Sequence, residues 1–196
     1  MSKLAIFFPG IGYNCDRPLL YYARKLAVSC GYECRAVNYA YNGDMNIRGN
    51  IRKMEEAFKE LYRQAEEILS DAEPDRYDEV LFISKSVGTV IAAAYAGSLR
   101  EKGICDASAF RHVLYTPLEY TFKYDPQNAA AFLGTADPWC VPEEVVRIAK
   151  EHDVPMDVYG GADHSLETGD VAADLLILKD VMEKTESFMK KPGGRT

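Results

Sequence analysis

Six short apolar segments recur along the chain, and each is bounded by turn-forming residues such as glycine, proline, asparagine or aspartate. Their lengths and their content of branched and aromatic side chains are typical of β-strands. Several are unbroken apolar runs, which is the pattern of strands buried on both faces of a parallel sheet. The predicted strands cover residues 4–8, 33–39, 79–83, 112–115, 130–133 and 156–159.

Between these strands, apolar residues recur every three or four positions, which is the spacing of one face of an α-helix. The pattern is clearest in residues 19–30, 51–68 and 171–189. Asp16 and Pro18 mark the beginning of the first helix and Gly31 marks its end, while Pro142 suits the first turn of another. Strands that alternate with helices predict parallel β-α-β units. The expected fold is a three-layer α/β/α domain with a mainly parallel six-stranded sheet.

The composition is that of one compact domain. The chain has 196 residues, of which 47% are hydrophobic, and this is enough for one complete core. We expect a single domain over residues 1–190 and a flexible tail over residues 191–196. The net charge of −7 and the lack of a lysine and arginine run argue against nucleic acid or an anionic membrane as a partner.

The N-terminal segment MSKLAIFFPG has an apolar run of five residues before Pro9. This is too short for a signal peptide or a membrane span, so a cytoplasmic location is predicted. The cysteines lack C-x-x-C spacing, so free, mostly buried thiols are expected rather than disulfides or a zinc site, and no metal or cofactor is predicted. They are Cys15, Cys30, Cys34, Cys105 and Cys140.

The segment FISKSVGTVIAAAYAG, residues 82–97, passes from a strand pattern to a helix pattern without an ordinary loop. Such a sharp turn forces its central residue, Ser86, into an unfavourable backbone conformation and needs small neighbours, here Ser84 and Gly88. The Ser86 hydroxyl then projects beyond the carboxyl end of a strand, with the N–H of Val87 directed into the same space. The turn therefore predicts a nucleophile and one oxyanion donor; an ordinary helix cap is the alternative.

A serine nucleophile needs an imidazole to accept its proton and a carboxylate to orient that imidazole. His112 begins a strand at the wrong end of the sheet, and His152 ends a helix. His164 follows the last strand in a glycine-rich loop, and Asp137 follows the fifth strand. The predicted catalytic residues are therefore Ser86, Asp137 and His164.

Two other carboxylates were candidates for orienting His164. Glu119 follows the fourth strand and is the second candidate. Asp163 adjoins His164 in the chain, but the side chains of neighbouring residues diverge. Asp137 is for this reason preferred.

The motifs SKSVG, GTADPWCVP and GADHSLE together resemble the α/β-hydrolase superfamily over nearly the whole chain. The resemblance implies the order nucleophile, acid, base, the sheet order 2-1-3-4-5-6 and a serine hydrolase without a cofactor. It also implies a second oxyanion donor in the loop after the first strand, where FFPGIGYN has Pro9 instead of the common histidine. The N–H of Ile11 or Gly12 would serve as that donor.

In many relatives a helical cap is inserted after the fourth strand, but the connection here, residues 116–128, is too short for one. A capless enzyme is expected. This connection carries Tyr120 and Phe122, which are predicted to line a substrate pocket together with Tyr13 and Trp139. Packing of the connection against the flank of the sheet is the alternative.

The expected function is carboxylesterase-like cleavage of a small-molecule acyl ester or thioester by a monomer or a homodimer. A peptidase or another acyl hydrolase on the same triad is an alternative, and so is a catalytically silent binding protein of the same fold. A dinucleotide-binding turn at Gly10-Ile11-Gly12 is disfavoured, because Cys15 stands where the third glycine is required.

Overall fold

The computed structural model describes residues 1–43, 47–104 and 109–191, so Cys105 and residues 192–196 of the expected tail lie outside it. Its centre is a six-stranded sheet in the order β2-β1-β3-β4-β5-β6, in which every pair of neighbours is parallel. The predicted sheet order is confirmed. The strands are β1 Lys3–Phe8, β2 Glu33–Ala36, β3 Glu79–Lys85, β4 Phe110–Tyr115, β5 Ala129–Gly134 and β6 Met156–Tyr159.

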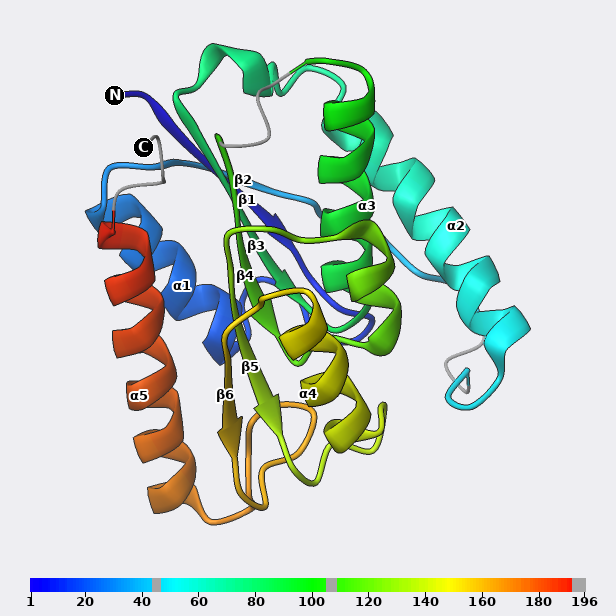
Figure 1. Ribbon diagram of the computed structural model, residues 1–196, viewed down its shortest axis with the longest axis vertical. Helices are drawn as coiled ribbons and strands as arrows, with labels where there is room; N and C mark the ends of the chain where they lie inside the picture. The colour runs from blue at the N-terminus through cyan, green and yellow to red at the C-terminus, as the bar shows by residue number, and fades with distance from the viewer. Residues whose placement is uncertain (44–46, 105–108, 192–196) are drawn as a thin grey trace.

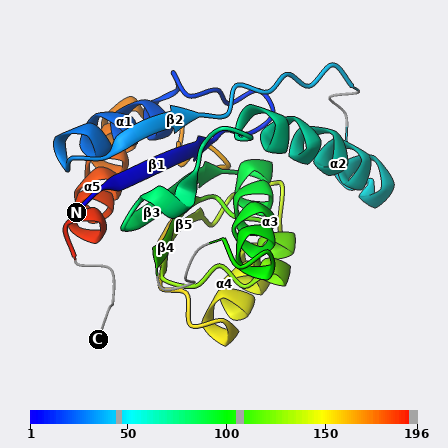
Figure 2. The same cartoon turned by 90° about the horizontal axis from the view of Figure 1, so that it is seen from above.

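Helices cover both faces of the sheet, as expected for parallel crossover units (Figure 1). Helices α1 and α5 lie on one face, and α2, α3 and α4 lie on the other (Figure 2). Their bounds are α1 Pro18–Ser29, α2 Ile51–Ile68, α3 Val87–Glu101, α4 Pro142–Glu151 and α5 Val171–Lys190. The described residues also include the short 3₁₀ helices η1 Pro74–Arg76 and η3 Glu119–Tyr124. No helix in the described part of the chain is long and apolar enough to cross a membrane.

The unbroken apolar runs are explained by burial on two faces. In β3, Val80 and Phe82 pack into the core beneath α2 and α3, whereas Leu81 and Ile83 pack into the core beneath α1 and α5. All four side chains are fully buried. Because successive side chains of a strand point to opposite faces, a central strand between two helical layers has no position for an exposed polar residue.

The edge strand β2 is shorter than predicted, ending at Ala36 rather than Tyr39. The N–H of Val37 still donates to the carbonyl of Phe7, at 2.9 Å. Beyond this bond the chain leaves the sheet, and the Tyr39 hydroxyl donates to the carbonyl of Pro9. The apolar pattern of residues 37–39 therefore reflects packing beside the sheet, not strand pairing.

The start of α1 also differs from the prediction. The residue before Pro18 is Arg17, and no side chain caps this helix, so Asp16 is not its N-cap. Pro18 at the first helical position needs no partner for its nitrogen, which explains why the helix can begin there. Gly31 follows the helix with φ of +83°, as expected for a residue that ends one.

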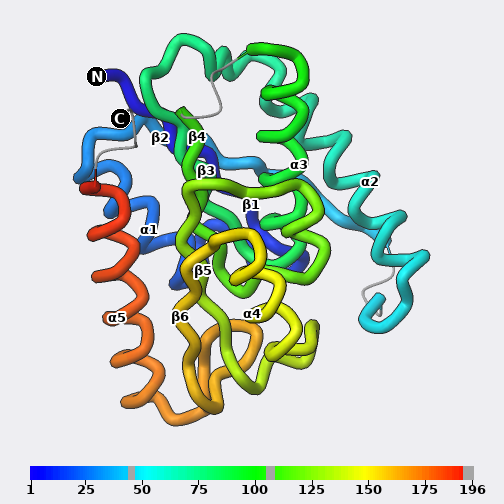
Figure 3. Tube along the Cα trace, in the orientation of Figure 1, coloured from blue at the N-terminus to red at the C-terminus, as the bar shows by residue number. Residues whose placement is uncertain are grey.

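All strands run in one direction, so the loops that follow them lie along one edge of the sheet (Figure 3). The described cysteines Cys15, Cys30, Cys34 and Cys140 are free thiols, but only Cys15 is buried, so the expectation that most are buried was wrong. The edge formed by the carboxyl ends of the strands carries Ser86, Asp137 and His164, which follow β3, β5 and β6.

Candidate active site

Ser86 occupies a strained turn between β3 and α3. Its backbone has φ of 58° and ψ of −131°, in a region that L-residues rarely adopt. Its N–H donates to the carbonyl of Tyr115 at 3.0 Å, and its carbonyl accepts from the N–H and the hydroxyl of Thr89 at 2.8 and 2.6 Å. Hydrogen bonds on both sides hold the turn, which is how a strained residue persists at a functional site.

Of the two small neighbours of Ser86 that the sequence predicted, Gly88 is required by close approach. An added Cβ at Gly88 would lie closer than 3.0 Å to the carbonyl oxygens of Phe8 and Pro9, so α3 approaches β1 too closely for a side chain there. Ser84 is fully buried, and its hydroxyl donates to the carbonyl of Val113 at 3.2 Å. The turn is therefore fixed by contacts with β1 and β4.

Replacing Gly88 by alanine is expected to lower the free energy of unfolding by about 3 kcal/mol or more, because a methyl group would meet backbone atoms that cannot move aside. The matched control is Gly97→Ala in the same helix, where only the end of the Arg100 side chain lies within 4 Å, at 3.9 Å. In this control, the free energy of unfolding should rise by about 0.5–1 kcal/mol. Urea unfolding of both variants measures the difference, and equal midpoints would contradict the close approach.

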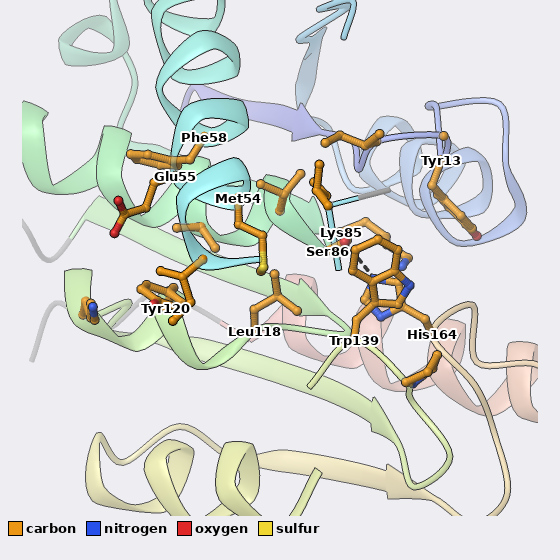
Figure 4. Close-up of a pocket in the computed structure, with 18 of the residues that line it drawn as sticks. Tyr13, Met54, Glu55, Phe58, Lys85, Ser86, Leu118, Tyr120, Trp139 and His164 are labelled. Atoms are coloured by element: carbon orange, nitrogen blue, oxygen red, sulfur yellow. Dashed lines mark hydrogen bonds between the residues drawn. The ribbon is translucent and has the colours of Figure 1, made fainter. Parts of the chain in front are cut away.

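His164 and Asp137 complete a hydrogen-bonded chain that begins at Ser86. The Nε2 atom of His164 lies 2.7 Å from the Ser86 hydroxyl oxygen, and its Nδ1 lies 2.6 Å from Oδ2 of Asp137. Each residue comes from the loop after a different strand, namely β3, β5 and β6. Figure 4 shows His164 directed toward Ser86. Residues 51 and then 27 positions apart in the sequence thus meet at one point of the sheet edge.

Asp137 is held in place on both of its oxygens. Oδ1 accepts the N–H of Trp139 at 2.9 Å, while Oδ2 faces the His164 ring, and the Asp137 side chain has no exposed surface. Because an ionised carboxylate only accepts hydrogen bonds, it places the ring proton of His164 on Nδ1 and leaves Nε2 free to accept from Ser86.

The two alternative carboxylates have other partners. Glu119 accepts the backbone N–H of Val141 at 2.9 Å, which ties η3 to the beginning of α4. Asp163 accepts the backbone N–H groups of Ser165 and Glu167, at 2.6 and 3.1 Å, and thereby shapes the loop that carries the histidine. Neither carboxylate forms a hydrogen bond with the His164 ring among the described residues.

The other two histidines lie away from this cluster. His112 is buried within β4, stacked on Phe82 with ring centroids 5.1 Å apart, and burial lowers its pKa to about 3. His152 ends α4 and faces Asp125, with Nδ1 3.3 Å from a carboxylate oxygen. Both have structural surroundings, in agreement with the sequence prediction.

Burial lowers the pKa of His164, and the nearby positive charge of Lys85 acts in the same direction. The hydrogen bond and the negative charge of Asp137 partly oppose these effects. The imidazole is therefore neutral at neutral pH, which is the form that can accept a proton from Ser86.

Lys85, the residue before Ser86, is a finding that the sequence did not anticipate, because lysines are rarely buried. It is only 1% exposed, and its Nζ lies 5.0 Å from the centre of the Tyr13 ring. No carboxylate of the described residues lies within ion-pair distance of Lys85 Nζ. Burial lowers the pKa of Lys85 to about 7, an effect partly offset by the charges of Asp137 and Asp163.

The loop after β1 approaches Ser86 as the resemblance implied. An added Cβ at Gly10 would lie 3.0 Å from the Cβ of Ser86, and Gly10 and Tyr13 exchange two backbone hydrogen bonds that close the turn. This turn brings Ile11 and Gly12 to the same cavity as Ser86 and Val87. The N–H groups of Ile11 and Val87 donate to no other backbone group in the described parts of the chain.

A cavity of about 660 Å³ opens at Ser86, and three of the four predicted aromatic residues line it: Tyr13, Tyr120 and Trp139. The Trp139 ring lies 5.7 Å from the His164 ring, and the Tyr13 hydroxyl accepts the N–H of Leu19 at 3.1 Å. Burial raises the pKa of Tyr13 to about 12.

The fourth predicted aromatic residue, Phe122, does not line the cavity. It is 1% exposed and packs in the core formed by β4, β5 and α4. Residues 119–124 form the 3₁₀ helix η3 rather than an extended segment, so Tyr120 and Phe122 do not share a face. The assignment of Phe122 to a substrate pocket was wrong for this reason.

Part of the cavity wall was missed by the sequence analysis. Helix α2 contributes Ile51, Met54 and Phe58, and Leu118 and Val90 lie opposite. The sequence placed the first three on the apolar face of a helix, but nothing in its periodicity distinguishes a residue that lines a cavity from one that packs in the core. In the described chain, no group of three histidine, cysteine, aspartate or glutamate residues is arranged to hold a metal ion.

No known family model matches the chain, and no curated protein matches its sequence. Solved structures do match. A putative hydrolase from Agrobacterium vitis has a TM-score of 0.66 at 14% identity, covering 96% of this chain and 88% of that one. An esterase from Pyrococcus furiosus has a TM-score of 0.66 at 15% identity, covering 98% and 84%. A putative α/β-superfamily hydrolase from Xanthomonas campestris has a TM-score of 0.59 at 14% identity, covering 95% and 99%. The chain therefore has the α/β-hydrolase fold.

Proposed function

We propose that this protein is a serine hydrolase that cleaves a carboxylic ester or thioester through an acyl-enzyme. The observation that carries the proposal is the continuous hydrogen-bonded chain from Ser86 through His164 to Asp137, located at the mouth of a cavity. The likeness to solved hydrolases and esterases supports it at the level of the fold. A binding protein does not need a strained serine whose hydroxyl faces a neutral imidazole.

In the first half of the reaction, the Ser86 oxygen attacks the substrate carbonyl carbon while its proton moves to Nε2 of His164. The imidazolium that results is stabilised by Asp137, which keeps its negative charge. The carbonyl oxygen becomes an oxyanion in the tetrahedral intermediate. When the intermediate collapses, the bond to the leaving group breaks, and His164 returns the proton to the departing oxygen or sulfur.

The oxyanion is assigned to the N–H groups of Val87 and of Ile11 or Gly12. All three residues line the cavity beside Ser86, and Val87 begins α3, where unpaired N–H groups and the helix dipole favour negative charge. Removal of one donor from an oxyanion hole typically lowers kcat by about 10²–10³-fold.

In the second half, water attacks the acyl carbon of the Ser86 ester. His164 again accepts a proton, now from water, and then returns one to the Ser86 oxygen as the acid product leaves. These steps need no cofactor. Esters and thioesters are proposed rather than amides because their leaving groups depend less on protonation by His164.

Covalent labelling tests the proposal without knowledge of the substrate. A fluorophosphonate reacts with an activated serine by losing fluoride, which adds one phosphonyl group to the protein. Wild type and Ser84→Ala are expected to gain one adduct by intact mass, and Ser86→Ala none. The control removes a buried serine two residues away whose hydroxyl bonds only to a carbonyl. If folded wild type gains no adduct, the binding-protein alternative replaces the proposal.

A further inference from the structure

The two halves of α2 differ in what covers their apolar faces. In the C-terminal half, Leu61 and Ala65 are buried against the rest of the protein, and Ala57 near the middle of the helix is buried as well. In the N-terminal part, Met54 is half-buried and Ile51 is 61% exposed, although both are apolar and lie on the cavity wall. Figures 1 and 2 both show this end of α2 extending away from the sheet. Its apolar face therefore meets a cavity instead of a protein partner.

The opposite wall of this part of the cavity is also apolar. Leu118, which precedes η3, is 4% exposed, and Val90 of α3 is 6% exposed. The rings of Phe58 and Tyr124 stack with centroids 6.1 Å apart, so they join α2 to η3. We define the α2–η3 groove by its lining side chains Met54, Phe58, Val90, Leu118 and Tyr120.

The α2–η3 groove extends from Ser86 in one direction. In Figure 4, Met54 and Leu118 lie between Ser86 and the more distant pair Phe58 and Tyr120. No charged side chain belongs to the α2–η3 groove as defined. Three charged residues of the cavity lining, Glu55, Lys59 and Lys123, are exposed. The Nζ atom of Lys123 lies 4.1 Å from the centre of the Tyr120 ring.

The direction of proton transfer decides which part of the substrate enters the α2–η3 groove. The leaving group must lie beside Nε2 of His164, because it receives the proton from this atom. His164 and Trp139 lie on the other side of Ser86 from Phe58 (Figure 4). The acyl part of the substrate must then extend from the Ser86 ester toward α2.

We propose that the α2–η3 groove binds an uncharged, unbranched acyl chain of medium length, so that the substrates of this enzyme are medium-chain acyl esters or thioesters. The inference rests on the proposed function of Ser86. It accounts for the uncovered apolar face at the beginning of α2, which a bound chain would remove from water. Since apolar burial is roughly proportional to area, each added methylene that enters the groove contributes to binding.

The first test is the rate of hydrolysis across a series of p-nitrophenyl esters from acetate to palmitate. The value of kcat/KM is expected to rise about twofold to fourfold per methylene up to about octanoate and then to level off or fall. A series that is flat, or that falls from acetate onward, would overturn the chain-binding proposal. Fluorophosphonate labelling of Ser86 in the same preparation separates the chain-binding proposal from the proposed function. If Ser86 is labelled but kcat/KM does not rise with chain length, the chain-binding proposal fails and the proposed function stands.

Two substitutions test the location of the chain. Met54→Trp fills the middle of the α2–η3 groove and should lower the octanoate-to-acetate ratio of kcat/KM at least tenfold. Its control is Glu56→Trp, which places the same ring on the same helix outside the cavity, at an exposed position. The control should leave the ratio within about twofold.

Phe58→Ala removes the ring that stacks on Tyr124 and opens the far end of the α2–η3 groove. The preferred chain should become longer by two or more methylenes. An unchanged octanoate-to-acetate ratio in Met54→Trp, together with an unchanged optimum in Phe58→Ala, would show that the chain binds elsewhere and would overturn the proposal. If no preparation hydrolyses any ester and no adduct forms, the proposed function and this inference fail together.

Discussion

Replacing His164 by alanine is expected to lower kcat for ester hydrolysis by about 10⁶-fold. Its Nε2, 2.7 Å from the Ser86 oxygen, is the ring nitrogen in reach of the nucleophile, so without it none of the proton transfers of the two half-reactions has a partner. The p-nitrophenyl octanoate assay measures the loss, and circular dichroism checks the fold. The matched control is His152→Ala, which removes a histidine at the end of α4, outside the cavity lining.

The loss should not add to that of the nucleophile. Because Ser86 and His164 act as one unit, the double variant Ser86→Ala/His164→Ala is expected to retain about the same residual rate as either single variant. Additive losses would show that the two residues act independently. A His164→Ala protein that keeps more than about one hundredth of the wild-type rate would contradict the proposed role of the imidazole as the base.

The second large effect is expected for Asp137→Asn, which should lower kcat by about 10⁴-fold. The asparagine side chain can donate to Nδ1, so the ring would carry its proton on Nε2 and donate to Ser86 instead of accepting from it. The control is Asp163→Asn. Asp163 accepts hydrogen bonds from backbone N–H groups, and the amide oxygen of asparagine can accept the same bonds. The control should stay within about tenfold of wild type in the same assay.

The pH dependence of the residual activity provides an independent check on Asp137. The carboxylate raises the pKa of His164, both by its hydrogen bond and by its charge. In Asp137→Asn this contribution is lost, and the pKa of the imidazole falls further below its ordinary value. Activity needs the neutral ring, so the acid limb of the kcat/KM profile should move to lower pH. A shift to higher pH would contradict the contact between Asp137 and His164.

The strands and helices could be predicted because the pattern of burial is local. The β3 run, buried on both faces, and the helical spacing of residues 51–68 are each contained in a short segment. Boundaries were less certain where tertiary contacts decide them. Tyr39 was assigned to a strand, yet it lies beside the sheet and bonds to Pro9, a residue 30 positions away.

Ser86, Asp137 and His164 could be chosen because the end of each parallel strand is recognisable, and these ends share one edge of the sheet. The sequence already favoured Asp137 over Glu119 and Asp163, although all three are carboxylates near that edge. The structure separates them by partner: the His164 ring for one and backbone N–H groups for the other two.

The shape of the cavity was the part that the sequence did not disclose. Phe122 was assigned to the pocket and lies in the core, whereas Met54 and Phe58 of α2 were not assigned and line the wall. Lys85 is buried beside Tyr13, although lysines are rarely buried. In each case the side-chain type is compatible with both locations.

The sequence by itself therefore determined the order of strands and helices, the sharp turn at Ser86 and the residues that could serve as base and acid. These follow from spacing within short segments and from the common direction of parallel strands. Only the tertiary structure decided which aromatic residues face the cavity and that the beginning of α2 lies over it. Those outcomes depend on how a helix is positioned against distant segments, and the periodicity of one helix contains no information about the surface it will meet.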